Sequence, residues 1–154
     1  MDKREKISMV WAMKYFSLLV VAVAVFLAGC ATPSLQQQAA TADYGVGPEN
    51  TRQVVLDYFA RTTYQPGSVQ VLAVGKGYKG YCNDPAYIPK GQNFGWGIVT
   101  TVSANDQGGY PVGPKSYVLF YRNGKVLNSY EVVPPQTPGN WVIPIEQLPA
   151  EPVR

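Results

Sequence analysis

The chain contains no histidine among its 154 residues, and only ten of them are aspartate or glutamate. Histidine is the usual general base near neutral pH, the partner of catalytic serine and cysteine, and a common zinc ligand. The carboxylates are spread singly along the sequence, so no pair is spaced for shared acid and base catalysis, and no run of oxygen ligands suits calcium. We therefore expect a protein that is not an enzyme and that holds no cofactor or metal.

Long apolar runs are also scarce, and the one present lies near the N-terminus. A basic start is followed by an apolar stretch over 18–27, by Ala28 and Gly29, and then by Cys30. This order is typical of a signal peptide. The alternative is a transmembrane helix that stays in place, but the apolar stretch over 15–29 is shorter than the ~20 residues that a spanning helix needs.

Residues 27–30, Leu-Ala-Gly-Cys, resemble the lipobox of bacterial lipoproteins. The resemblance implies that residues 1–29 are removed and that the thiol of Cys30 receives a lipid. Two or more acyl chains hold a protein stably at a membrane, whereas one does not. Ala31 follows the cysteine, where Gram-negative lipoproteins kept at the inner membrane commonly have aspartate. The resemblance therefore implies an outer-membrane protein that faces the periplasm of a Gram-negative host.

Little net charge remains after such a cleavage. Four of the 13 Lys and Arg residues and two of the 10 Asp and Glu residues lie in residues 1–29, which leaves nine basic and eight acidic side chains. A nearly neutral chain offers no electrostatic basis for binding nucleic acid. We expect the partners to be the membrane, through the lipid on Cys30, and an envelope protein or peptidoglycan.

The remaining sequence predicts an α+β domain: one N-terminal amphipathic helix packed on an antiparallel sheet of about four to five strands. Residues 51–62 carry apolar side chains at helical spacing, after Pro48 and Glu49, which suit a helix start. Asn123-Gly124, between apolar runs over 116–122 and 125–132, is the strongest short signal for a hairpin within a meander.

Three further strands are expected, over 69–75, over 92–104 and, as a short edge strand, over 141–143. Residues 76–91 predict an irregular loop or a short ribbon, and residues 105–115 predict a second loop. In the strand over 92–104, Trp96 and Ile98 alternate with Gly95 and Gly97. The two glycines indicate either close approach by another group or a β-bulge.

The predicted organisation is a signal peptide over 1–29, the lipidated cysteine with a flexible tether over 30–43, one globular domain over 44–146 and a tail over 147–154. The tether is expected because residues 31–43 are rich in Gln, Ala and Thr and lack apolar periodicity.

Residues 44–130 also resemble a largely uncharacterised group of small bacterial envelope lipoproteins. The resemblance rests on Pro-Gly-Ser at 66–68, Gly-Trp-Gly at 95–97, an Asn- and Gly-rich turn over 105–110, and Asn-Gly-Lys at 123–125. It implies a fold and an envelope location, and it brings no catalytic residue.

Cys82 has no partner for an intrachain disulfide if Cys30 carries lipid. In an oxidising periplasm an odd cysteine indicates a disulfide to another chain or a reactive thiol. The alternative is a small buried residue that happens to be cysteine.

Tyrosines are abundant, with 11 in the chain. Tyr78, Tyr81 and Tyr110, together with Tyr87, Trp96 and Trp141, could form an exposed aromatic platform for a partner, since tyrosine offers a flat apolar face and a hydroxyl. The alternative is that these rings pack over the core, and for Trp96 the core is favoured.

These patterns together predict a membrane-anchored, non-enzymatic binding or assembly module that contacts an envelope component through residues 76–91 and 105–115. The alternative is a glycan-binding lipoprotein similar to inhibitors of muramidases.

Overall fold

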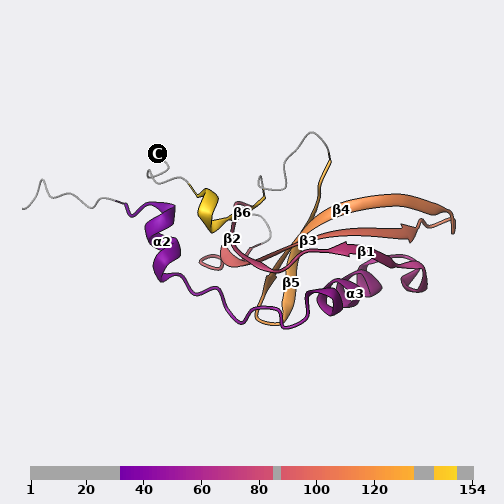
Figure 1. Ribbon diagram of the computed structural model, residues 1–154, viewed down its shortest axis with the longest axis horizontal. Coiled ribbons are helices and arrows are strands. Elements are labelled where there is room, and N and C mark those ends of the chain that lie inside the picture. Colours follow the sequence, from indigo (N-terminus) through magenta and orange to yellow (C-terminus); the bar gives the residue numbers. More distant parts are fainter. Residues whose placement is uncertain (1–31, 85–87, 134–140, 149–154) are drawn as a thin grey trace, which may run out of the picture. The chain divides into compact units, whose positions relative to one another are not determined.

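Figure 1 shows the computed structural model, which describes residues 32–84, 88–133 and 141–148. The chain divides into the units Met1–Pro33 and Ser34–Arg154, and every described element lies in the second. These elements are α2 (Leu35–Thr41), α3 (Thr51–Thr62), η1 (Pro66–Ser68), β1 (Gln70–Val74), β2 (Tyr78–Cys82), β3 (Phe94–Asn105), β4 (Pro111–Arg122), β5 (Lys125–Glu131), β6 (Val142–Pro144) and η3 (Ile145–Gln147). None of the described helices is long and apolar enough to cross a membrane. The α+β class is confirmed, whereas Cys30 and the predicted signal peptide lie outside the described residues.

The strands form one antiparallel sheet with the order β5-β4-β3-β2-β6, and β1 is a sixth strand that pairs with β3. β1 lies against Thr100–Ser103 of β3, and β2 lies against Phe94–Gly97. These two short strands therefore follow one another along the same edge of β3. The sheet has one strand more than expected, because β2 forms within residues 76–91. β6 pairs with β2 close to where an edge strand was predicted.

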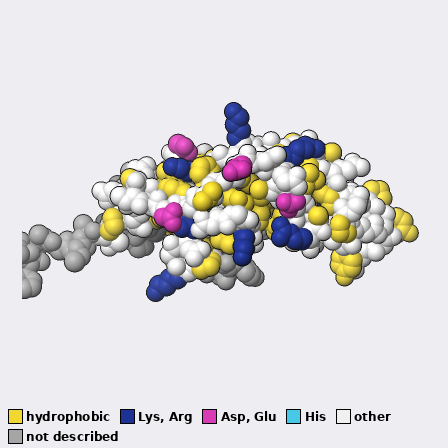
Figure 2. All heavy atoms as spheres, turned by 90° about the horizontal axis from the view of Figure 1, so that it is seen from below, with side chains coloured by type: hydrophobic (Ala, Val, Ile, Leu, Met, Phe, Trp, Pro, Cys, Tyr) yellow, Lys and Arg dark blue, Asp and Glu magenta, His cyan; other side chains and the backbone are white. Residues whose placement is uncertain are grey.

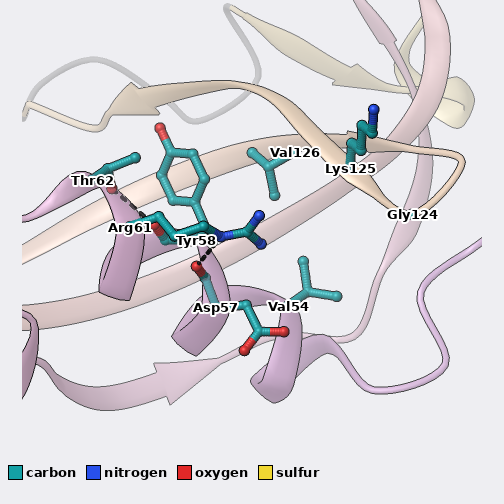
Figure 3. A pocket seen from close by; sticks show the side chains of 8 residues that line it. All are labelled: Val54, Asp57, Tyr58, Arg61, Thr62, Gly124, Lys125 and Val126. Carbon is teal, nitrogen blue, oxygen red and sulfur yellow. Dashed lines mark hydrogen bonds between the residues drawn. The ribbon is translucent and has the colours of Figure 1, made fainter.

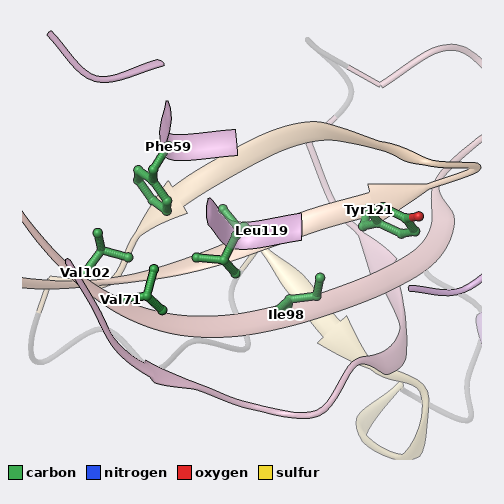
Figure 4. Close-up of a cluster of buried hydrophobic side chains, with 7 residues drawn as sticks. Phe59, Val71, Ile98, Val102, Leu119 and Tyr121 are labelled. Atoms are coloured by element: carbon green, nitrogen blue, oxygen red, sulfur yellow. The ribbon is translucent and has the colours of Figure 1, made fainter. Parts of the chain in front are cut away.

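α3 covers one face of the sheet (Figure 4). The helix begins at Asn50, whose side-chain oxygen accepts a hydrogen bond from the Gln53 amide at 3.1 Å and so satisfies a free helix N–H. Val55 and Phe59, one turn apart, are buried against the sheet. They meet the buried side chains of Val71, Ile98, Val102, Leu119 and Tyr121. Each fully buried apolar side chain of this size contributes about 1.5–3 kcal/mol.

The opposite face holds a second buried cluster, formed by Cys82, Ile88, Val118, Phe120, Tyr130 and Val142. Here the glycines of β3 allow rings to lie directly on the backbone. A Cβ atom on Gly97 would lie 2.2 Å from Cζ of Tyr78, and one on Gly95 would lie 2.7 Å from Cζ of Phe120. The pairing of β3 is regular with β2 from Phe94 to Gly97 and with β4 from Trp96 to Val102, so close approach, rather than a bulge, explains these two glycines.

A flexible tether is predicted over 30–43, but residues 35–41 of this segment form α2. Ser34 Oγ accepts a hydrogen bond from the Gln37 amide at 3.2 Å, and Gln37 Oε1 accepts one from the Ser34 amide at 3.0 Å. This reciprocal capping box begins the helix. The side chain of Gln36 donates to the carbonyl of Leu148 at 2.8 Å. Leu148 is itself buried, so the predicted tail begins too early, and residues 149–154 lie outside the described part.

The sequence predicted the turn of the β4–β5 hairpin correctly, but it predicted too long a loop for the β3–β4 hairpin. Asn123 and Gly124 have φ values of 49° and 82°, as the predicted Asn-Gly turn requires. The loop expected over 105–115 is shorter in the structure, because β4 already begins at Pro111. Asp106 closes this turn, since its Oδ1 accepts hydrogen bonds from the amides of Gly108 at 2.8 Å and Tyr110 at 2.9 Å.

Candidate functional site

The four domain residues predicted to bind a partner do not form one surface. Tyr78 and Tyr81 are both on β2, but three positions apart, so their side chains lie on opposite faces of the sheet. Tyr78 pairs with Gly97, whereas Tyr110 follows the turn after Asn105. Gly97 and Asn105 are eight residues apart on β3, which at about 3.3 Å per residue is about 26 Å. The single aromatic platform is therefore corrected to separate groups.

Tyr78 and Cys82 belong to the buried cluster on the face away from α3. The hydroxyl of Tyr78 donates to the Val142 carbonyl at 3.0 Å, and burial, with a smaller contribution from Cys82, raises the pKa of Tyr78 to about 12. Cys82 is 0% exposed, and its Sγ lies 3.2 Å from the hydroxyl of Tyr130. Burial raises the pKa of the thiol, which lowers the reactive thiolate fraction. Cys82 thus has the surroundings of a small buried residue, and a disulfide to another chain would require this region to open.

Tyr130 links this cluster to polar side chains. Its hydroxyl lies within hydrogen-bond distance of Cys82 Sγ, receives a bond from Asn128 Nδ2 at 3.0 Å and donates to Asp84 Oδ2 at 3.1 Å. Trp141 stacks on the ring of Tyr130 with 5.2 Å between centroids and 5° between planes. Burial is the main cause of the raised pKa of Tyr130. Tyr87, expected in the same group, lies outside the described residues.

Tyr81 belongs to an aromatic group that fastens the segment between the helices. The centroid of its ring lies 5.2 Å from that of Phe94, and the centroid of Phe94 lies 5.7 Å from that of Tyr44. Nζ of Lys79 lies 4.9 Å from the centre of the Tyr44 ring. Trp96 donates its indole N–H to the Gly45 carbonyl at 3.3 Å and packs against the α3 cluster, as the core alternative predicted. These rings hold residues 44–45 against the sheet.

Arg122 reinforces this attachment and was missed in the sequence. Its side chain is 8% exposed and pairs with Asp43 Oδ2 at 2.7 Å. It also donates to the main-chain carbonyls of Asp43 and Phe94. The partners lie 79 positions apart in the sequence, so no local pattern could have shown the pair.

Among the described residues, the most exposed aromatic rings lie at the other end of β3. We call this region, residues 105–110 with 64–68, the hairpin tip. Tyr110 is 72% exposed and Tyr64 is 73% exposed. Hydrogen bonds from Asn105 Nδ2 to Gln65 Oε1 at 3.2 Å and from the Asn105 amide to Ser68 Oγ at 2.9 Å join the two segments. On the face drawn in Figure 2, the right-hand end shows apolar side chains without charged ones, whereas both kinds are spread over the rest of the face.

An apolar cleft of about 190 Å³ adjoins the hairpin tip. It lies between the end of α3 and the first half of β4. Its apolar lining comes from Phe59, Val102, Ala104, Val112 and Tyr117.

A second hollow, which we call the helix groove, separates α3 from the β4–β5 hairpin (Figure 3). It has a volume of about 300 Å³ and is lined by Val54, Asp57, Tyr58, Arg61, Thr62, Gly124, Lys125 and Val126. It continues into a more open hollow of about 590 Å³ near the start of α3, since both share Val54, Asp57 and Gly124.

No group of three or more Cys, Asp or Glu side chains among the described residues is placed to hold a metal ion. Comparison with protein-family models, with curated proteins and with solved structures finds no match for this chain.

Proposed function

We propose that the chain is a lipid-anchored, non-enzymatic envelope lipoprotein whose domain binds another envelope protein through the hairpin tip. The Leu-Ala-Gly-Cys motif at 27–30 supports the lipid on Cys30, and Ala31 supports placement at the outer membrane facing the periplasm. The observation that carries the binding role is the position of Tyr64 and Tyr110 relative to the start of the folded unit.

That position follows from chain lengths. Ser34 comes four residues after Cys30, which is at most about 14 Å of extended chain. α2 lies at the Phe94 end of β3, because Tyr44 contacts Phe94 and donates its hydroxyl to the Ala39 carbonyl at 2.8 Å. β3 then runs from Phe94 to Asn105, about 36 Å. A lipid on Cys30 would therefore leave the hairpin tip at the end farther from the membrane.

The tip also has the composition of a binding surface. Tyrosine buries a large area on contact, loses little conformational entropy and retains a hydroxyl for hydrogen bonding. The adjoining apolar cleft could receive a side chain of the partner. Residues 78–82 of the loop predicted over 76–91 form β2 beside Phe94–Gly97, far from the hairpin tip, so these residues are not part of the tip surface.

Lipidation is tested by labelling cells with an alkyne analogue of palmitate. The wild-type chain should incorporate the label and fractionate with the outer membrane, and Cys30→Ser should do neither. An unlabelled wild-type protein would refute the lipid anchor.

The binding surface is tested by placing a photoreactive amino acid at Tyr110 or Tyr64 in the intact envelope. Trp141, which is 42% exposed but lies beside β2 near the Phe94 end of β3, is the control. We expect the two tip positions to capture the same envelope protein and Trp141 not to. Capture from all three positions alike, or from none, would count against the tip.

A further inference from the structure

The helix groove is built differently from the hairpin tip, and nothing in the proposed function uses it. Its floor is apolar, with Val54 and Tyr58 on α3 facing Val126 on β5 (Figure 3). Its rim carries amide and charged side chains. Such a combination fits a ligand that presents both apolar surface and fixed polar groups.

Arg61 supplies an oriented cation. Its Nε donates to the Asp57 carbonyl at 2.9 Å, which holds the guanidinium beside the groove. The ion pairs found among the described residues are Lys115–Glu131 and Arg122–Asp43, so Arg61 has no counter-ion there. The two outer N–H edges of a guanidinium match a carboxylate in a paired, fork-like contact.

The nearest carboxylate does not compete strongly for this contact. Asp57 Oδ1 accepts a hydrogen bond from Gln53 Nε2 at 2.8 Å, and Asp57 forms no ion pair with Arg61. Lys125 adds positive charge at the rim, although Figure 3 shows its ammonium pointing away from α3.

Amide donors lie at the other end of the hollow. Asn50 and Asn123 use their side-chain oxygens to accept from the amides of Gln53 at 3.1 Å and Val46 at 2.9 Å. This assignment leaves both NH₂ groups as donors for carbonyl oxygens of a ligand. Glu49 lines the same end, where it would favour a positively charged group.

The distance between the two ends sets the length of the ligand. Asn50 and Arg61 are eleven residues apart along a helix that rises 1.5 Å per residue, which gives about 17 Å. An extended peptide covers this length with about five residues. We propose that the helix groove binds an extended peptide of about five residues, with its terminal carboxylate on Arg61 and its amino terminus near Glu49.

The test uses the full-length protein in detergent and a position-scanned library of pentapeptides with free termini. The same library with C-terminal amides removes the carboxylate, and peptide-free glycan oligosaccharides test a sugar ligand. Binding is followed by calorimetry for the wild type, Arg61→Ala, Arg61→Lys and Arg52→Ala. Arg52 is the matched control, because it is also an exposed arginine of α3 but donates to the Val71 carbonyl beside β1.

We expect the best free-acid peptides to bind at least about ten-fold more tightly than their amides. Arg61→Ala should remove that difference, Arg61→Lys should restore part of it, and Arg52→Ala should leave it unchanged. Urea unfolding of each variant confirms that the fold is kept. The proposal would be overturned if acids and amides bound with equal affinity, or if Arg61→Ala bound the free-acid peptides as tightly as the wild type. It would also be overturned if only the glycans bound, or if no pentapeptide bound at a concentration on the order of 1 mM, where even weak specific binding is detected. None of these outcomes depends on the lipid or on the hairpin tip.

Discussion

Replacing Gly97 by alanine tests whether the ring of Tyr78 requires an empty position on β3. The new methyl group would lie 2.2 Å from Cζ and 2.5 Å from the hydroxyl oxygen of Tyr78, far inside contact distance. The ring must therefore move away from the sheet. Movement also breaks the hydrogen bond from the Tyr78 hydroxyl to the Val142 carbonyl.

The expected cost combines these two effects. Overpacking a tight site costs about 1–3 kcal/mol, and loss of a hydrogen bond costs about 0.5–1.5 kcal/mol. Alanine would otherwise be favoured over glycine within a strand by about 0.5–1 kcal/mol. We expect Gly97→Ala to lower the free energy of unfolding by about 2–3 kcal/mol.

Urea unfolding followed by tryptophan fluorescence measures this change. With a slope of about 1–2 kcal/mol per molar urea, the midpoint should fall by roughly 2 M. Gly113→Ala is the matched control, because its Cβ would meet nothing within 4 Å, and it should be neutral or stabilising. Adding Tyr78→Ala should remove most of the cost of Gly97→Ala. A loss of the same size with and without the Tyr78 ring would refute the reasoning.

Three further outcomes follow from the buried groups. Alkylation of Cys82 should be slow in the folded protein and should rise with unfolding in urea, and rapid labelling without urea would contradict its burial. The pKa of Tyr78, raised from its usual 10 to about 12, means that the folded state keeps this proton longer than the unfolded state. Its contribution to stability is therefore complete below pH 10 and lost between pH 10 and about 12, a loss that Tyr78→Phe should reduce when urea midpoints are compared over that range. Asp43→Asn leaves the buried Arg122 without a counter-ion and should cost about 1–2 kcal/mol in the same assay, whereas the exposed Asp57→Asn should cost almost nothing.

Local patterns predicted the parts of the fold that depend on neighbouring residues. Helical spacing located α3, alternation located β3, and Asn123-Gly124 located the β4–β5 turn. Two elements, β2 and α2, were not predicted, and the reasons differ. Glycine-rich residues 76–91 concealed β2, because Gly80 and its neighbours form a strand only when β3 and β6 pair with both edges. Ser34 and Gln37 have the spacing of a capping box, which indicates a helix start. The polar composition of residues 31–43 nevertheless favoured a flexible tether over a helix.

The candidate sites were less predictable, because they depend on contacts between distant segments. Tyr110 is exposed, as the platform alternative predicted, but Tyr64, which follows α3 in the adjoining segment, was not selected. The helix groove joins α3 to a hairpin more than 60 residues later in the chain. Neither composition nor residue spacing shows which distant segments come into contact. The ion pair between Arg122 and Asp43 could not be predicted for the same reason.

The fastening of residues 43–46 has a mechanical consequence. Arg122, Trp96 and Asn123 hold this segment from β4, β3 and the β4–β5 turn respectively. Tension applied at Cys30 would first separate α2 from Leu148. The force would then act on these three side chains, which pass it to the central strands before it reaches α3. Single-molecule stretching from the N-terminus should record the release of α2 as a separate event at low force, followed by unfolding of the sheet. Between these two events the sheet domain remains folded, while the segment that joins it to Cys30 lengthens as α2 becomes extended chain.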